Sequence, residues 1–441
     1  MSYKSSLKSK LDEADVEVGD LVSISKNGKK YEGVLLPNSS SDETFVLKLD
    51  GGYNIGIEDS ENVILEKVKE GDEKTGQISP TVKGEEGEKE GEVSVLLAGG
   101  TIASRVDYRT GAVKPSATEE EFLSFTPEIA EIADIEVREV MQTLSENIQP
   151  GDWKKIAEEV GEEIRKGKDG VVVAHGTDTM GYTAAALSFM LEDLSVPVVL
   201  VGSQRSSDRG SSDSHQNLVC AIKAATSDIA EVTVCMHGES SDSFCYLHPG
   251  TKVRKMHTSR RDAFKTVNGK PIAKVDWETL EVETIKEDYR RKEKERETKL
   301  KNGFSQDVAL VKIYPGMDPD ALEAQLDGKE AAVLEGTGLG HAPIKNEKIR
   351  EVLKEYREGG NITFMSSQCL YGRVNMNVYE TGVDLQELGV IGNLHDMLPE
   401  TAYVKLGWLL GNYDKEKVEE LMLKNLRGEI SERTKQDQFR R

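Results

Sequence analysis

Short apolar runs that lead into glycine recur along this chain, and they constrain its fold more than any other sequence feature. In the first half they occupy residues 93–100 (VSVLLAGG), 171–176 (VVVAHG), 196–203 (VPVVLVGS) and, more weakly, 231–238 (EVTVCMHG). Runs this continuously apolar are typical of strands that are covered on both faces. Segments with apolar residues at helical spacing, such as residues 153–164, lie between them. The alternation predicts a doubly wound parallel sheet in a larger α/β domain over residues 93–284.

The same pattern returns in the second half of the chain. The runs are VALVKIYPG, AAVLEGTGLG and NITFMSS, at residues 308–316, 331–340 and 361–367. They predict a smaller C-terminal α/β domain over residues 306–441. Residues 285–305, between the two domains, are mostly charged, which predicts a charged linker that is solvated or forms an exposed helix.

The first part of the chain has a different pattern. Five short strand-like segments lie between residues 16 and 68, and Asn27-Gly28 between the first two is a strong hairpin signal. This pattern predicts a small β-barrel of the SH3 or tudor type within residues 1–70. Residues 71–92 are polar, charged and rich in glycine, so we expect a flexible linker there. The sequence does not indicate what the barrel binds.

Charge and composition exclude several functional classes. The net charge of −22 repels phosphate backbones, which argues against DNA binding and against RNA binding without a basic partner. This acidity is also compatible with adaptation to a salty cytoplasm. The four cysteines have no CxxC pair or zinc spacing, so we expect reduced thiols and no metal site. Without an apolar signal core or a run of about 20 apolar residues, a cytoplasmic protein is expected.

Hydroxyl and carboxylate side chains follow two of the predicted strands, at the edge of a parallel sheet where ligands bind. After the first run come Gly100 and Thr101, where the glycine lets a substrate approach the backbone closely. After the second come Gly176, Thr177 and Asp178, before a predicted helix whose N-terminus favours developing negative charge. The structural alternatives are a buried Thr101 in a turn, and Asp178 or Thr179 as the N-cap of the helix. The first segment lacks the spacing of a nucleotide-binding loop.

Three further residues could complete a site for amide hydrolysis. Lys255 lies in a polar loop, where a lone lysine is usually solvated. Beside a threonine and an aspartate, however, a lysine can take a proton from the hydroxyl while the carboxylate orients it. Ser145 and Glu146 precede a predicted helix and could hold the head group of an amino-acid substrate, or they could form a cap or a turn.

These segments together resemble the asparaginases that use a threonine nucleophile. GGTIA at residues 99–103 and HGTDT at residues 175–179 resemble the two signature motifs of that family, and they occur in the family's order. GSQR at residues 202–205 and GTGLGH at residues 336–341 support the resemblance, which covers the chain from residue 93 onward.

The resemblance implies a role for each matching residue. It implies that Thr101 is the nucleophile and that Thr177, Asp178 and Lys255 form a second hydroxyl–carboxylate–lysine group. Tyr108 matches the tyrosine of the family's mobile flap, so it is a candidate for catalytic support.

The resemblance also implies a substrate-binding set. Ser145 and Glu146 match the pair that binds the α-carboxylate and amino group of the substrate, and Glu146 stands where many members have glutamine. Gly100 and Gly176 are expected beside the substrate carbonyl. His341 is expected to bind substrate and stands where many free asparaginases have asparagine. These two departures concern the selection of the substrate rather than the chemistry.

With its N-terminal barrel and linker, nearly the whole chain resembles the family of D-type subunits of archaeal glutamyl-tRNA(Gln) amidotransferases. This resemblance implies a glutaminase that supplies ammonia for converting Glu-tRNA(Gln) to Gln-tRNA(Gln). It implies no cofactor on this chain, with ATP and Mg²⁺ on a partner, the E-type subunit of the amidotransferase, which also makes most tRNA contacts. A dimer of this chain within a 2:2 heterotetramer is expected. A free cytoplasmic asparaginase or glutaminase is the alternative, and a non-catalytic binding protein is the third class.

Overall fold

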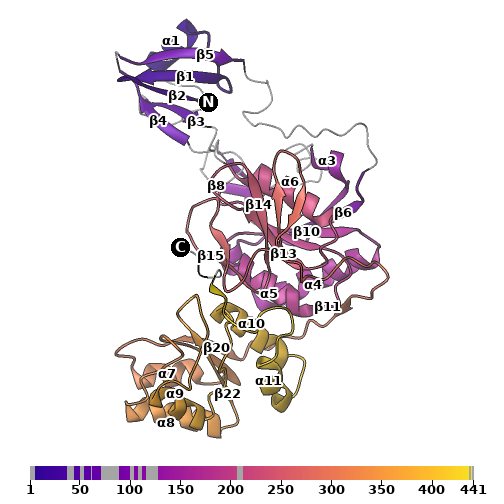
Figure 1. Cartoon of the computed structure of the whole chain (residues 1–441), viewed down its shortest axis with the longest axis vertical. Coiled ribbons are helices and arrows are strands. Elements are labelled where there is room, and N and C mark those ends of the chain that lie inside the picture. The colour runs from indigo at the N-terminus through magenta and orange to yellow at the C-terminus, as the bar shows by residue number, and fades with distance from the viewer. Residues whose placement is uncertain are drawn as a thin grey trace.

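A computed structural model gives the fold of the chain (Figure 1). The structure describes residues 5–36, 44–49, 54–60, 62–70, 89–99, 104–107, 112–115, 128–205, 212–436 and 439. Among these residues, no helix is both long and apolar enough to cross a membrane. All four cysteines lie in the described part and form no disulfide.

The N-terminal module is a five-stranded antiparallel sheet with the strand order β4-β3-β2-β1-β5. Its elements are α1 (Ser5–Glu13), β1 (Leu21–Lys26), β2 (Lys29–Leu36), β3 (Thr44–Lys48), β4 (Asn54–Glu58) and β5 (Ile64–Lys69). Asn27 (φ 52°) and Gly28 (φ 76°) form the tight turn that joins β1 to β2, as the sequence predicted. Helix α1 was not anticipated; it places Leu7 and Leu11 in the core of the barrel.

The central module is built on an eight-stranded sheet with the order β18-β17-β14-β13-β12-β10-β6-β9. Five strands are parallel: β6 (Glu92–Leu97), β9 (Asp134–Glu139), β10 (Gly170–Ala174), β12 (Val198–Val201) and β13 (Val232–His237). Four of them lie in the predicted apolar runs, whereas β9, at the edge of the sheet, was not predicted. Three antiparallel strands extend the sheet beyond β13: β14 (Phe244–Pro249), β17 (Ala273–Asp276) and β18 (Val282–Thr284).

Helices cover both faces of this sheet (Figure 1). The helical elements are α3 (Ile129–Ile132), the 3₁₀ turn η1 (Ser145–Asn147), α4 (Pro150–Arg165), α5 (Met180–Met190) and α6 (Ser214–Thr226). Successive strand residues alternate between the two cores: Val171 packs with α4 and α5, and Val172 packs with α6. A continuously apolar strand therefore packs its alternate residues into two cores, one on each face of the sheet.

Three two-stranded sheets stand outside the large sheet. They pair β7 (Ser104–Asp107) with β8 (Ala112–Pro115), β11 (Leu191–Glu192) with β19 (Lys299–Leu300), and β15 (Val253–Lys255) with β16 (Phe264–Thr266). The β15–β16 hairpin carries Lys255, a predicted site residue, as the last residue of β15.

The C-terminal module has a three-stranded parallel sheet, β20-β21-β22, and five helices in the described residues. Its elements are β20 (Val308–Lys312), α7 (Pro319–Leu326), β21 (Ala331–Gly336), α8 (Glu347–Glu358), β22 (Ile362–Ser367), α9 (Glu380–Glu387), α10 (Pro399–Leu410) and α11 (Lys415–Met422). Helix α10 packs on α5 of the central module, with Trp408 stacked on Phe189 at 5.5 Å between ring centroids. The two modules therefore share one continuous core.

The charged segment at residues 285–305 contains no helix and is held against the central module. Its β19 pairs with β11, and Lys292 and Lys294 place their ammonium groups 2.9 and 2.7 Å from the Asp169 carboxylate. Partial burial raises the pKa of Asp169, but the two ammonium groups outweigh it and lower that pKa to about 2. Charged residues here tie the connection down by ion pairing, which composition alone cannot distinguish from solvation.

Candidate active site

Strands β6 and β10 are hydrogen-bonded neighbours, and they end at the same edge of the sheet. Their last paired residues are Leu97 and Ala174, so the GGTIA and HGTDT segments begin next to each other. Gly99 has a φ of +95°, and a Cβ built on it would lie 2.1 Å from the carbonyl oxygen of Thr143. Only glycine can pass this close to a backbone carbonyl with that φ. Its place in the motif therefore has a steric cause.

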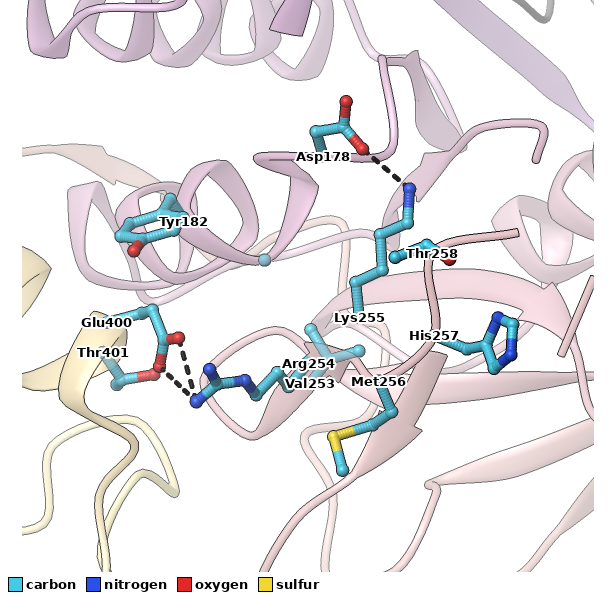
Figure 2. Close-up of a pocket in the computed structure, with 11 residues that line it drawn as sticks. Asp178, Tyr182, Val253, Arg254, Lys255, Met256, His257, Thr258, Glu400 and Thr401 are labelled. Carbon is cyan, nitrogen blue, oxygen red and sulfur yellow. Dashed lines mark hydrogen bonds and ion pairs between the residues drawn. The ribbon is translucent and has the colours of Figure 1, made fainter. Parts of the chain in front are cut away.

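Thr177, Asp178 and Lys255 come together at this edge. The Lys255 ammonium donates hydrogen bonds to the Thr177 hydroxyl at 2.9 Å and to the Asp178 carboxylate at 2.7 Å. Figure 2 shows the lysine reaching across from the β15–β16 hairpin to the loop before α5. The Lys255 side chain is 17% exposed and that of Asp178 is 64% exposed, so the group is open to solvent on its carboxylate side. The arrangement can pass a proton between a hydroxyl and an amine.

The side chains of Asp178 and Thr179 do not cap helix α5. Helix α5 has Thr179 at its N-cap without a side-chain cap hydrogen bond. The Thr179 hydroxyl donates instead to the Ser145 carbonyl at 2.7 Å, and the Asp178 carboxylate accepts from Lys255. Both side chains therefore link the loop to other parts of the site.

Ser145 lies against the same loop. It is 4% exposed and opens the η1 turn. A Cβ built on Gly176 would lie 2.7 Å from both Cβ and Oγ of Ser145, so glycine at this position lets the two segments touch. Glu146, the next residue, is exposed. The structure thus places one predicted substrate-binding residue in contact with the HGTDT loop and the other beside it on the surface.

His175 was not singled out from the sequence, yet it organises the loop. Its Nδ1 lies 2.7 Å from the Gly176 carbonyl, and its Nε2 lies 2.9 Å from the Thr183 hydroxyl, which accepts from the Trp153 indole. A carbonyl only accepts, so Nδ1 carries the proton and Nε2 accepts from Thr183. Burial lowers the pKa of His175 to about 4, which keeps the ring neutral. This network fixes the peptide that joins Gly176 to Thr177. A histidine directly after a buried strand was the available signal.

The loop after β12 is held by a buried carboxylate. Asp213, fully buried, accepts hydrogen bonds from the backbone amides of Gln204 and Arg205 at 3.0 and 2.9 Å. Asn217 donates to Asp213 at 2.9 Å and to the Gly202 carbonyl at 3.0 Å. The GSQR motif is therefore a turn stabilised from α6, at the edge of the sheet that carries the HGTDT loop.

A pocket of about 370 Å³ opens beside Lys255 (Figure 2). It lies between the β15–β16 hairpin and the first turns of α5 and α10, and its walls include Tyr182, Arg254 and Glu400. Arg254 and Glu400 form an ion pair at 3.0 Å. Burial raises the pKa of Tyr182 to about 12, with the Glu400 carboxylate adding to the effect, so the phenol stays neutral. Within the described ranges, no cluster of three or more His, Cys, Asp or Glu side chains is placed to hold a metal ion.

For four of the predicted residues, the described structure shows no place in this group. Gly100, Thr101 and Tyr108 lie outside the described residues, and their roles stay predictions. His341 lies after β21 in the C-terminal module, where its ring meets Tyr379 edge-on at 5.5 Å. In the part of the chain that the structure describes, no hydrogen bond or ion pair joins His341 to the Lys255 group.

Comparison with known proteins agrees with this architecture. Residues 92–288 match the family model "Asparaginase, N-terminal", residues 307–422 match "Glutaminase/Asparaginase C-terminal domain", and residues 16–68 match "GatD N-terminal domain". The L-asparaginase of Thermococcus kodakarensis is similar in structure, with a TM-score of 0.68, 32% identity, and coverage of 77% of this chain and 99% of that one. L-asparaginase I of Vibrio cholerae has a TM-score of 0.67 at the same identity and coverage.

Relatives that match over the full length have a further feature in common. The D-type subunit of glutamyl-tRNA(Gln) amidotransferase from Pyrococcus abyssi is 49% identical over 98% of this chain and 99% of its own length. Its counterpart from Thermococcus kodakarensis is 51% identical over 96% of this chain and 97% of its own length. Each match covers nearly the whole chain, with the N-terminal domain at residues 16–68 included, whereas the asparaginase structures cover 77% of it. The chain belongs to the GatD family, the D-type subunits of glutamyl-tRNA(Gln) amidotransferase, with an asparaginase-like fold behind the N-terminal domain of that family.

Proposed function

We propose that this chain is the glutaminase subunit of a tRNA-dependent amidotransferase. It hydrolyses the side-chain amide of glutamine, or of asparagine, and delivers the ammonia to a partner subunit. One observation carries the proposal: the Lys255 ammonium lies between the Thr177 hydroxyl and the Asp178 carboxylate. This group stands at the end of β10, beside the strand that leads into Thr101.

In this mechanism the Thr101 hydroxyl attacks the carbonyl carbon of the side-chain amide. A C–O bond forms, the C–N bond breaks, and ammonia leaves with the proton from the hydroxyl. Water then attacks the acyl ester, the ester C–O bond breaks, and the acid product leaves. Lys255 gives up one of its protons toward the Thr101 oxygen, which becomes a hydroxyl again, and takes the proton of the water through Thr177, while Asp178 balances the charge. Backbone amides near Gly100 and Thr177 are suited to stabilise the oxyanion, an effect worth on the order of 3 kcal/mol per donor.

Substrate selection falls to the residues around η1. Ser145 touches the HGTDT loop, so its hydroxyl or backbone can hold the α-carboxylate of an amino-acid substrate close to the reacting carbonyl. Glu146 beside it is exposed and negatively charged, which suits an α-ammonium group. The neutral His175 supports this arrangement by fixing the Gly176–Thr177 peptide.

The second half of the reaction belongs to a partner. The relatives are named as subunits of a glutamyl-tRNA(Gln) amidotransferase. With a net charge of −22, this chain alone is poorly suited to hold tRNA. We therefore assign ATP, Mg²⁺ and most tRNA contacts to an E-type subunit, in a cytoplasmic 2:2 assembly in which this chain also pairs with itself. No cofactor is assigned to this chain.

A free asparaginase is the weaker alternative. The two L-asparaginases match 77% of this chain, and asparaginase activity does not explain the N-terminal domain at residues 16–68. The relatives of the GatD family match both parts.

The test is ammonia release from glutamine and asparagine, with and without an E-type subunit, ATP and glutamyl-tRNA(Gln). The proposal expects weak release from the chain alone and a strong increase with the complete system. Fast release from asparagine that ignores the partner would instead establish the free enzyme.

Two variants test the chemistry in the same assay. Lys255→Met should lower amide hydrolysis by two orders of magnitude or more, because proton transfer typically contributes about 10²- to 10⁴-fold. Lys299→Met removes an equal charge from a lysine that is 61% exposed and should leave the rate unchanged. Equal activity of the two variants would remove Lys255 from the mechanism.

A further inference from the structure

The hairpin that carries Lys255 is not part of the large sheet. Strands β15 and β16 bond only to each other in the described sheets. One face of the hairpin is anchored by apolar packing, since Val253 and Phe264 are buried in the shared core. On β16, the Thr266 hydroxyl lies 2.8 Å from Nδ1 of His248 on β14, and Lys265 donates to the Gly238 carbonyl at 3.2 Å. Further contacts come from the residues at the base of the hairpin, directly before β15 and after β16.

Lys252, directly before β15, is tied to the C-terminal module. Its ammonium lies 3.1 Å from the Asp396 carboxylate, and the two side chains are only 9% and 1% exposed. The other oxygen of Asp396 accepts a hydrogen bond from the Ser431 amide at 2.8 Å. A buried pair with this second bond holds one geometry, because either charge alone would be costly to bury.

Asn268, two residues after β16, connects the other end of the hairpin to the C-terminal module. Its side-chain amide donates to the carbonyls of Leu370, Gly372 and Asp396 at 3.1, 3.3 and 3.0 Å. Its side-chain oxygen accepts from the Gly372 amide at 2.9 Å. The residue is 4% exposed and has a φ of 53°, a conformation that asparagine tolerates better than most residues. All four bonds end on the C-terminal module.

Two more contacts join the β15 region to helix α10 of the C-terminal module. The Thr401 hydroxyl of α10 donates to the Thr251 carbonyl at 2.9 Å, and Arg254 pairs with Glu400 at 3.0 Å. Lys255 itself reaches in the opposite direction, to Thr177 of the central module. The hairpin therefore bridges the modules: its base is bonded to the C-terminal module, while Lys255 and β16 contact the central module.

We propose that Asn268 and the Lys252–Asp396 pair are positioning residues for Lys255. The inference rests on the proposed function, in which Lys255 moves protons. Lys252 and Lys255 are three residues apart along an extended strand, a separation of about 10 Å. A small rotation at the base therefore displaces the ammonium from the hydroxyl, and a misplacement of about 1 Å can cost about 10²-fold in rate.

Asn268→Gly is the most direct test. Glycine keeps the positive φ without strain and removes all four side-chain hydrogen bonds. Asn27→Gly is the matched control, because Asn27 has a φ of 52° in an exposed turn of the barrel. We expect Asn268→Gly to lower kcat for amide hydrolysis at least tenfold. KM should change less than twofold, since Ser145 lies on another element. The control should match the wild type.

Three measurements separate positioning from a general loss of structure. Rates are normalised to the folded fraction, so a kcat that recovers fully after normalisation would overturn the proposal. Hydrogen exchange should be faster at residues 253–266 in Asn268→Gly and unchanged in β13; unchanged exchange at the hairpin would contradict it. Asp396→Asn, compared with Asp307→Asn on the exposed surface, should repeat the loss of kcat.

The activity of Lys255→Met distinguishes the two proposals. If that variant is inactive while Asn268→Gly keeps the wild-type kcat, the positioning role is wrong and the proposed function stands. If Lys255→Met hydrolyses amides as well as the wild type, the proposed function is wrong, and the positioning role falls with it.

Discussion

Replacing Glu429 with glutamine should destabilise the α/β part of the chain strongly, because it leaves the Lys405 ammonium buried without a counter-ion. The two side chains are fully buried, with the ammonium 2.6 Å from the carboxylate. Lys405 also donates to the Met422 carbonyl, and the carboxylate accepts from the amides of Leu426 and Arg427. Burial lowers the pKa of Lys405, and the Glu429 carboxylate opposes this effect.

The magnitude follows from the cost of an unpaired buried charge. Breaking such a pair from one side typically costs about 3–5 kcal/mol. For a unit of this size, that loss corresponds to a fall in Tm on the order of 10 °C. Glu432→Gln is the matched control, because it removes the same charge from an exposed position nearby. Adding Lys405→Met to Glu429→Gln removes the stranded charge and should recover at least half of the lost stability.

Thermal unfolding followed by tryptophan fluorescence is a suitable assay. Trp408 lies on α10, one turn from Lys405, and is 1% exposed, so its emission reports on this core. Because the chain has several modules, midpoints of the same transition are compared rather than one global free energy. A Glu429→Gln midpoint within about 1 °C of the Glu432→Gln midpoint would refute the reasoning, since losing the Lys405–Glu429 ion pair would then cost no measurable stability.

Two further predictions concern the pH dependence of stability, which involves His175 after β10 and His395 after β22, and the contact between Gly176 and Ser145. Burial lowers the pKa of both His175 and His395 to about 4. The unfolded chain therefore takes up protons that the native chain does not. The stability that each neutral histidine contributes is fully present above pH 6.5, and about 3 kcal/mol per histidine is lost as the pH falls toward 4. Urea midpoints that stay constant from pH 7 to 4.5 would contradict this. Gly176→Ala places a methyl group against Ser145, so it should raise KM and cost about 1–3 kcal/mol of stability; an unchanged KM in steady-state assays would exclude that contact.

The strands and the main domains could be predicted because their signals are local. Continuous apolar runs predicted the parallel strands except the edge strand β9, whose residues are half-buried or exposed, and Asn27-Gly28 predicted the turn between β1 and β2. Helix α1 was missed because only Leu7 and Leu11 mark its buried face, and they are meaningful only once the barrel exists to cover them. The antiparallel extension beyond β13 was missed because those strands are short and alternate in burial.

The site was only partly accessible to such local signals. Thr177 and Asp178 follow a recognisable strand, but Lys255 is 77 residues from Asp178 and has no periodicity that points to the loop. Its chemistry made it a candidate, and only the resemblance to a known family placed it beside Thr177 and Asp178. The hydrogen bonds around His175, and those between Asn268 and the C-terminal module, join segments that are distant in sequence, so no single segment encodes them.

The segment at residues 285–305 shows the limit of composition. Its charge density predicts solvation, yet Lys292 and Lys294 face one carboxylate, Asp169, and the backbone pairs with β11 through β19. Composition gives the number of charges but not their partners. Those partners are set by the surface of the central module, which exists only after folding.

The central claim is that Thr101 forms an acyl ester during amide hydrolysis. The most direct measurement is mass spectrometry of the chain quenched during turnover of glutamine with its partner, ATP and glutamyl-tRNA(Gln). The account predicts a glutamyl adduct that maps to the peptide containing Thr101 and is absent from Thr101→Val, which releases no ammonia. Full ammonia release by Thr101→Val, or an adduct on another residue, would contradict it.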